Sequence, residues 1–198
     1  WFQPPREVIA ADGISLTLHE GETLAVVGES GSGKSTLGRM VMRLTEPDSG
    51  AIRLGSEDLR LLRGEALRQA RRGLQIIFQD PFSSLDPRQK VGDAVARGPM
   101  AYGTSRTEAM AQARQLLSRV GLTPSAADRY PHEFSGGQRQ RICIARALAL
   151  RPKVLIADEA VSALDVSVQA QVLALLAELR REMRLAMIFI THDLRIAA

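Results

Sequence analysis

The stretch Gly28-Glu29-Ser30-Gly31-Ser32-Gly33-Lys34-Ser35-Thr36 decides the fold of this 198-residue chain. It follows the apolar run Leu24-Ala25-Val26-Val27 and leads into residues 37–42, which suit a helix. A strand, a glycine-rich turn and a helix start, in this order, fit the phosphate-binding loop pattern G-x-x-x-x-G-K-[ST]. The glycines let backbone amides point toward a phosphate, and the helix directs its positive end at the anion. We therefore predict a nucleoside-triphosphate site.

For two side chains of this stretch we predict specific contacts with the nucleotide and its metal ion. Lys34 is placed to reach the β- and γ-phosphates, and the Ser35 hydroxyl is placed to hold Mg²⁺. The alternative is a glycine-rich turn with a chance lysine, which the flanking strand and helix patterns argue against. The other expected ATP contacts in the stretch are Gly28, Glu29, Ser30, Gly31, Ser32, Gly33 and Thr36.

Composition limits the class of protein. The chain is long enough for one well-cored domain, and no apolar run is long enough to cross a bilayer. The first residues do not form a signal peptide pattern, and the single cysteine, Cys143, excludes an internal disulfide and suits a reducing compartment. A net charge of +4 would suit nucleic acid. However, the arginines are scattered among acidic residues without interleaved aromatic side chains, so we expect solvated helix faces and no nucleic-acid partner.

Strand and helix patterns alternate along the chain, which indicates an α/β fold with a parallel sheet. We expect strands at residues 8–18, 23–27, 51–54, 74–78, 154–157 and 186–190. Helices are expected at residues 34–44, 59–72 (with Leu62, Ala66 and Leu67 buried), 91–120 with an interruption around Gly98-Pro99, 138–150 and 167–183. The helical part between 78 and 154 is too long for one crossover and is predicted to be an inserted subdomain.

Two further motifs carry chemistry. Asp158 and Glu159 follow the apolar run Val154-Leu155-Ile156-Ala157. An acid at that position can bind Mg²⁺, usually through water, and the adjacent glutamate could polarise an attacking water; the alternative is a pair of solvated acids. The second motif, Ser135-Gly136-Gly137-Gln138, stands at a helix start. Its glycines would expose amides to a phosphate; the alternative, which physical chemistry alone does not exclude, is an ordinary capped helix with a flexible entry.

The stretch Phe134-Ser135-Gly136-Gly137-Gln138-Arg139-Gln140-Arg141 resembles the signature motif of ATP-binding cassette (ABC) ATPases. The other motifs of that family occur in the family's order. They are Walker A at 28–36, the Q-loop glutamine Gln79, Walker B with its catalytic glutamate at 154–159, the D-loop Ser162-Ala163-Leu164-Asp165, and the switch histidine His192. The resemblance implies a P-loop NTPase (RecA-like) parallel-sheet core with an N-terminal antiparallel β region. In one domain spanning 1–198, residues 1–79 and 152–198 would form the core, and about 80–151 the helical signature subdomain.

Longer stretches resemble one branch of the family. Residues 78–88, 130–134 and 162–171 are similar to the ATPases of oligopeptide, dipeptide, nickel and glutathione importers. Most family members have proline after the Walker B glutamate, whereas this chain has Ala160. The run of residues 158–165 is most similar to the glutathione-importer ATPases, and the departure leaves both carboxylates intact.

The resemblance also implies a mechanism. Two such domains pair head to tail, with each ATP between Walker A of one domain and the signature of the other. Ser135, Gly136, Gly137 and Gln138 would thus serve the partner's nucleotide. Glu159, His192 and Gln79 would be the catalytic group, and Ser35, Gln79 and Asp158 the metal ligands. Either Trp1 or Phe2 would stack on adenine, unless this segment is a disordered terminus.

The implied setting is the cytoplasmic face of a bacterial inner membrane, where the domain would drive a transmembrane permease served by a periplasmic solute-binding protein. Two alternatives stay open. One is a soluble ABC ATPase that works on nucleic acid or the ribosome, which the importer-like Q-loop and the lack of a coiled-coil insertion oppose. The other is a regulatory ATP-binding module without turnover, which Glu159 and His192 oppose. Since the chain lacks an initiator Met and stops six residues after His192, we expect a C-terminally truncated domain of a longer protein.

Overall fold

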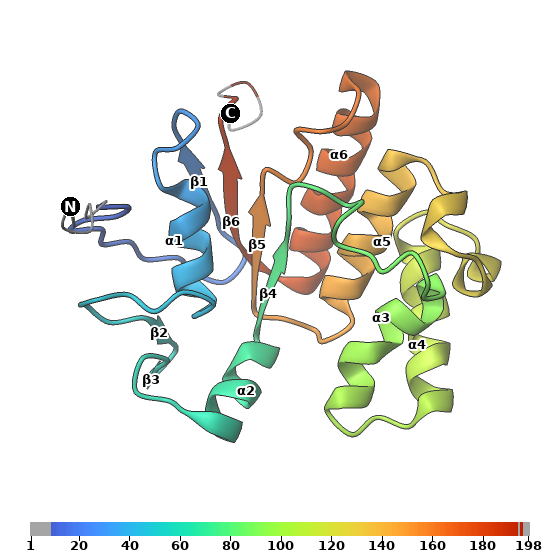
Figure 1. The fold of residues 1–198 in the computed structure, drawn as a ribbon, viewed down its shortest axis with the longest axis horizontal. Coiled ribbons are helices and arrows are strands. Elements are labelled where there is room, and N and C mark those ends of the chain that lie inside the picture. Colours follow the sequence, from blue (N-terminus) through green and yellow to red (C-terminus); the bar gives the residue numbers. More distant parts are fainter. Residues whose placement is uncertain (1–8, 194, 196–198) are drawn as a thin grey trace, which may run out of the picture.

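Four parallel strands form the centre of the protein (Figure 1). The computed structural model describes residues 9–193 and 195. The sheet has the order β1-β6-β5-β4, made by β1 (Thr23–Val27), β6 (Ala186–Thr191), β5 (Val154–Asp158) and β4 (Leu74–Ile77). In register, Val27 pairs with Thr191 and Asp158 pairs with Ile190. The phosphate loop, Asp158 and His192 therefore all leave the sheet at the same edge.

Helices cover both faces of this sheet. They are α1 (Lys34–Val41), α2 (Gly64–Arg72), α3 (Val91–Ala101), α4 (Arg106–Arg119), α5 (Gly136–Leu148) and α6 (Val166–Met183), with short 3-10 turns at Pro124–Asp128 and Pro131–Glu133. Alternate residues of β5 enter two separate cores: Leu155 and Ala157 join the larger one with α3 to α6, and Ile156 joins the smaller one near α1. A strand buried on both faces has no polar alternation, which explains the continuous apolar runs of the sequence.

Gly38 brings α1 close to the sheet. A Cβ atom at this position would lie 3.0 Å from Ile190 Cδ1 and 3.4 Å from Ile156 Cγ2. Because α1 directly follows the phosphate loop, this close packing fixes the loop over the carboxyl edge of the strands. Ligands of open parallel sheets bind at that edge.

The inserted helical part begins after β4 and ends before β5, and its division at residues 80–151 stays a prediction. The expected interruption around Gly98-Pro99 is wrong, because α3 continues through both residues. Gly98 lies against Leu150, where a Cβ atom would be 3.3 Å from Leu150 Cγ. The break instead falls between α3 and α4, where Gly103 has a φ of 91°. Ser105 then starts α4 by accepting a hydrogen bond from the Glu108 amide.

Two other sequence expectations also differ from the structure, a strand at residues 8–18 and the start of a helix at 59. Residues 9–18 form no strand, and Ile14 and Leu16 are 52% and 41% exposed. An alternating pattern makes a strand only where a neighbouring strand pairs with it. The antiparallel pair that does form joins β2 (Arg53–Leu54) to β3 (Glu57–Asp58).

The second expectation that differs is the helix at 59–72, because this helix, α2, begins only at Gly64. Leu59 is buried and its amide bonds the Ile52 carbonyl, so the chain here is still returning from β3. The described residues of α2 include no buried one: Ala66 is exposed and Leu67 half-buried. Leu62, before α2, is half-buried against the smaller core. Among the described residues, no helix is both long and apolar enough to span a membrane.

Candidate nucleotide site

The loop between β1 and α1 has the backbone of an anion-binding turn. Gly31 and Gly33 have φ values of 83° and 89°, which favour glycine. Gly33 occupies the position before α1 and supplies no side-chain cap. The first amides of α1 therefore have no side chain bound to them from that position. This geometry suits a bound phosphate.

Lys34 lies folded over the same loop. Its side chain is 7% exposed, and Nζ donates hydrogen bonds to the carbonyl oxygens of Gly28 at 2.7 Å and Glu29 at 2.6 Å. Burying an ammonium group is costly unless such bonds are made. The free protein thus already holds the positive charge within the phosphate loop.

Ser35 and Asp158 meet beside this loop. The Ser35 hydroxyl donates to Asp158 Oδ1 at 2.8 Å. Burial raises the pKa of the Asp158 carboxyl, the Ser35 bond opposes this shift, and the nearby Glu159 charge adds to it. Two hard oxygen ligands side by side fit Mg²⁺, which binds one or two protein oxygens and completes its shell with water and phosphate. The described residues contain no group of three or more His, Cys, Asp or Glu side chains placed for a metal.

The buried Asp158 charge leads to a stability prediction. Asp158→Asn keeps an oxygen that can accept the Ser35 bond and removes the buried charge, so the nucleotide-free protein should melt roughly 2–5 °C higher. Because the folded state raises the pKa of Asp158 above 3.8, the cost of ionising it is present above the raised pKa. The gain should therefore be largest at neutral pH and shrink as the pH falls toward 3.8. Calorimetry across this range checks it, and an unaltered or lower melting temperature at pH 7 would contradict it.

Glu159 contacts two other predicted residues. Gln79 Nε2 donates to Glu159 Oε2 at 3.0 Å, and His192 Nδ1 lies 3.3 Å from the same oxygen. Glu159 has a φ of 47°, an unusual value for a residue with a side chain, and its amide bonds the Ile190 carbonyl at 2.9 Å. Strained backbone of this kind is often found at functional sites. The two carboxylates therefore contact different groups, Asp158 with Ser35 and Glu159 with Gln79 and His192.

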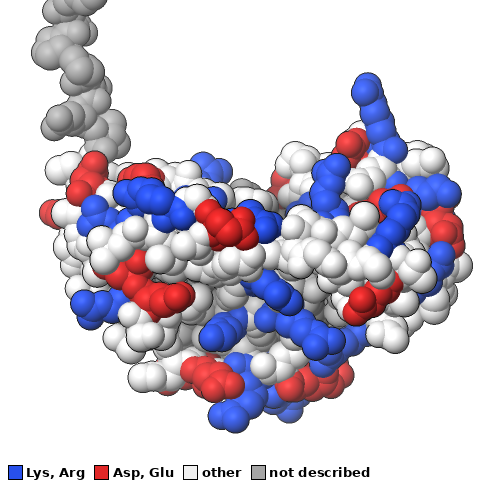
Figure 2. All heavy atoms as spheres, turned by 90° about the horizontal axis from the view of Figure 1, so that it is seen from below, with Lys and Arg blue, Asp and Glu red and all other residues white. Residues whose placement is uncertain are grey.

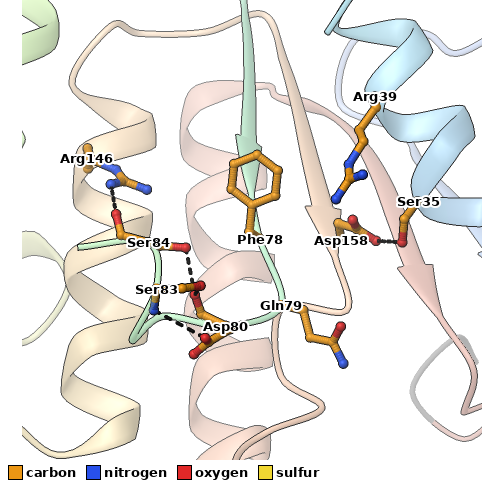
Figure 3. Close-up of a pocket in the computed structure, with 9 residues that line it drawn as sticks. All are labelled: Ser35, Arg39, Phe78, Gln79, Asp80, Ser83, Ser84, Arg146 and Asp158. Carbon is orange, nitrogen blue, oxygen red and sulfur yellow. Dashed lines mark hydrogen bonds between the residues drawn. The ribbon is translucent and has the colours of Figure 1, made fainter. Parts of the chain in front are cut away.

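A cavity of about 510 Å³ opens beside Ser35 and Asp158. It lies between α1, the segment after β4 and α5 (Figure 3). Ser35, Gln79 and Asp158 line one part of it. Six more lining residues were not predicted to be site residues: Arg39, Phe78, Asp80, Ser83, Ser84 and Arg146. Arg39 points toward Asp158, and Arg146 reaches the segment after β4 from the other side (Figure 3). The spacing of Arg146 predicted only a helix, so no sequence pattern separated it from other helical arginines.

The signature residues form a capped helix start. The Ser135 hydroxyl accepts from the Gln138 amide at 3.3 Å, and Gln138 Oε1 accepts from the Ser135 amide at 3.0 Å. Gly137 lies so close to α6 that a Cβ atom would be 2.3 Å from Val168 Cγ1. The structure thus contains the ordinary capped helix that was the alternative to a phosphate-binding motif. Helix α5 lies on the opposite face of the sheet from α1 (Figure 1).

The D-loop joins the turn after β5 to α6. The Ser162 hydroxyl donates to the Glu159 carbonyl at 3.0 Å, and the Leu164 carbonyl accepts from Gln169 at 3.0 Å. Ala163 and Asp165 are exposed. The expected adenine-stacking residues, Trp1 and Phe2, lie outside the described residues.

The parallel sheet, the glycine-rich loop and the Ser35–Asp158 pair define a P-loop nucleoside-triphosphatase. Residues 11–162 match the protein family described as ABC transporter, and the chain belongs to this family. It is 54% identical over 192 residues to the glutathione import ATP-binding protein GsiA of Pectobacterium atrosepticum, and 56% identical to GsiA of Salmonella choleraesuis. Each alignment covers 96% of this chain but 31% of the relative, so the chain spans about a third of these proteins.

Solved structures of cassettes have the same fold. The ATP-binding cassette MJ0796, a dimer in a post-hydrolysis state with ADP and Pi, matches with a TM-score of 0.87 and 29% identity, over 100% of this chain and 86% of the other. CbiO1 of Clostridium perfringens, part of the transporter complex cbiONQ, matches with a TM-score of 0.84 and 32% identity, over 94% and 73% of the two chains. The P-loop fold and the membership in the ABC ATPases predicted from the motifs are confirmed.

Proposed function

We propose that this chain is the ATP-hydrolysing domain of an importer for peptides or related small solutes, with glutathione as the favoured solute. The observation that carries the proposal is the position of Glu159, which Gln79 and His192 both contact beside the Ser35–Asp158 pair. The choice of solute rests on the relatives, which are named as glutathione import ATP-binding proteins. Since they are about three times as long as this chain, transport itself is a property to test on the longer protein.

Each contact suggests a step in hydrolysis. Lys34 and the loop amides would hold the phosphates of ATP. The Ser35 hydroxyl and the Asp158 carboxylate would hold a magnesium ion, which would supply positive charge beside the phosphates. Glu159 takes a proton from the water that attacks the γ-phosphorus, and the bond from that phosphorus to the bridging oxygen of ADP breaks. Gln79 and His192 keep the Glu159 carboxylate in place for this step, and His192 also steadies the γ-phosphate.

A second cassette completes the site in this proposal. Because α1 and α5 lie on opposite faces of the sheet (Figure 1), the signature of the same chain is far from its own phosphate loop in the fold. Ser135, Gly136 and Gly137 would instead contact the nucleotide of a partner cassette. We place the resulting dimer on a permease at the cytoplasmic face of a bacterial inner membrane.

Nucleic acid is the less favoured partner. On the face seen in Figure 2, Lys and Arg side chains are interspersed with Asp and Glu. Several arginines also bind groups of the protein itself, such as Arg68, which bonds Glu65 and the Ala101 carbonyl. Nucleic-acid surfaces usually have one sign of charge along a stripe or face. A mixed surface instead fits a protein that contacts other proteins.

The decisive experiment uses the complete protein that contains this domain, reconstituted with its permease in proteoliposomes. We expect ATP-dependent uptake of glutathione or short peptides, and loss of uptake with a non-hydrolysable ATP analogue. Stimulation of hydrolysis by RNA or ribosomes, without uptake of any of these solutes, would favour the soluble alternative. Nucleotide binding with no hydrolysis in the assembled complex would favour the regulatory one.

A further inference from the structure

Helix α5 contacts the segment after β4 at two places. We call residues 79–84 the Q-loop segment. Arg146 donates a hydrogen bond from its guanidinium to the Ser84 carbonyl oxygen, as Figure 3 shows. Seven residues earlier on α5, the Arg139 guanidinium lies 4.1 Å from the centre of the Phe82 ring. Residues seven apart lie on the same side of a helix, two turns from each other. One side of α5 therefore contacts both Phe82 and Ser84.

The Q-loop segment is itself tightly bonded. The Asp80 carboxylate accepts hydrogen bonds from the amides of Phe82 at 2.8 Å and Ser83 at 3.2 Å, and the Ser84 hydroxyl donates to the Asp80 carbonyl at 2.6 Å. The Phe82 amide, with Ser83, holds the pKa of the Asp80 carboxyl below its usual range. The carboxylate therefore stays ionised at neutral pH and keeps the turn closed. A turn bonded in this way moves as one piece rather than residue by residue.

Gln79 stands at the start of this segment and the signature stands at the start of α5. The Gln79 amide donates to Glu159 Oε2, so a small shift of the segment would move it away from the carboxylate. At the other end of the connection, Ser135 caps α5 and Gly137 packs against Val168. A force on the signature is therefore carried along α5 to the two arginines.

We propose that Arg139 and Arg146 are positioning residues that make the Q-loop segment move together with α5. The place of Gln79 at Glu159 then depends on the position of the signature in the same chain. This inference rests on the proposed function, in which Gln79 serves the chain's own nucleotide and the signature serves the partner's. The two arginines would thus connect the two ATP sites of a dimer.

Arginine suits this task for physical reasons. Its planar guanidinium presents several donors to a carbonyl oxygen and also stacks on an aromatic face, and it stays charged at any pH the protein meets. Besides stacking on Phe82, Arg139 donates a hydrogen bond from its Nε to the Pro131 carbonyl oxygen at 2.8 Å. This arginine therefore links the Q-loop segment both to α5 and to the turn before the signature.

The test uses the complete protein, assembled with its partner cassette, and the variant Arg146→Met, which keeps the side-chain length and removes the donors. We expect kcat to fall about tenfold, as when a group that orients a metal or catalytic ligand is lost. The KM for ATP should stay within about twofold, because the phosphate loop is untouched. The Hill coefficient for ATP should fall toward one, since coupling between the two sites is lost. The Mg²⁺ concentration at half-saturation should rise, because Gln79, a predicted metal ligand, is no longer held in place.

Arg106→Met is the matched control, since Arg106 forms an exposed ion pair with Asp93 and has no contact with the Q-loop segment. It should behave as the unmodified protein. Arg146→Lys should restore part of the cooperativity, because one donor remains for the Ser84 carbonyl. Arg139→Gln should reproduce the loss of cooperativity in milder form.

A double-mutant cycle separates positioning from stability. If Asp80→Ala and Arg146→Met both act by releasing the same segment, their effects on kcat should be clearly less than additive. Unaltered cooperativity and Mg²⁺ dependence in Arg146→Met would overturn the inference. So would a fall in kcat that comes with an equal loss of ATP affinity and a lower melting temperature. If the unmodified complex does not hydrolyse ATP at all, the proposed function fails instead, and the two failures are distinct.

Discussion

Glu159→Gln is expected to stop ATP turnover while ATP stays bound. The glutamine side chain has nearly the same shape, and its amide oxygen can still accept the hydrogen bond that Gln79 donates at 3.0 Å in the native protein. It cannot accept a proton from water, however, and loss of a general base lowers rates by about 10²- to 10⁴-fold. Phosphate release in the assembled complex measures the rate. Gel filtration with Mg²⁺ and ATP should show a closed dimer that persists.

Glu178→Gln is the control for this experiment. Glu178 is exposed on α6, so the same chemical change there should leave turnover within about twofold. Turnover of Glu159→Gln equal to that of the unmodified complex would remove Glu159 from the catalytic role. If Glu159→Gln lost ATP binding as well as turnover, Glu159 would instead be a residue that maintains the structure of the site.

The parallel core could be predicted from the sequence because its strands are marked by apolar runs. Val154-Leu155-Ile156-Ala157 is continuous and apolar because its residues are buried on both faces of the sheet. Residues 9–18 show the limit of this approach. Their alternation of apolar and polar side chains is what a strand needs, but a strand also needs a neighbour, and the pattern does not report whether one is present.

The site could be predicted as far as its chemistry depends on side-chain type. Motifs identified Ser35, Asp158, Glu159, Gln79 and His192, and the structure brings them together as two contacting groups. Contacts to backbone carbonyls could not be predicted, because any residue type offers a carbonyl. Arg146 binds that of Ser84, 62 positions away. Arg43, expected on a solvated face like other arginines, is 3% exposed and binds the Leu62 carbonyl at 2.9 Å.

Lys34→Ala should weaken nucleotide binding severely. The structure already holds the Lys34 ammonium in place within the loop, through the carbonyls of Gly28 and Glu29. Removing one partner of a buried charged contact typically costs about 2–5 kcal/mol. We therefore expect the Kd for ATP to rise about a hundredfold or more, which titration calorimetry would measure directly.

Loss of Lys34 could also disturb the empty loop, because the two carbonyls lose their donor. The melting temperature of Lys34→Ala without nucleotide reports this effect separately, and we expect a fall of only a few degrees since both carbonyls lie in a loop that water can reach. Lys153→Ala is the matched control, since Lys153 is exposed and precedes β5 at the opposite end of the sheet. ATP affinity of Lys34→Ala equal to that of Lys153→Ala would refute the phosphate role. A weakened affinity without a change in fold would leave charge at the phosphate loop as the cause.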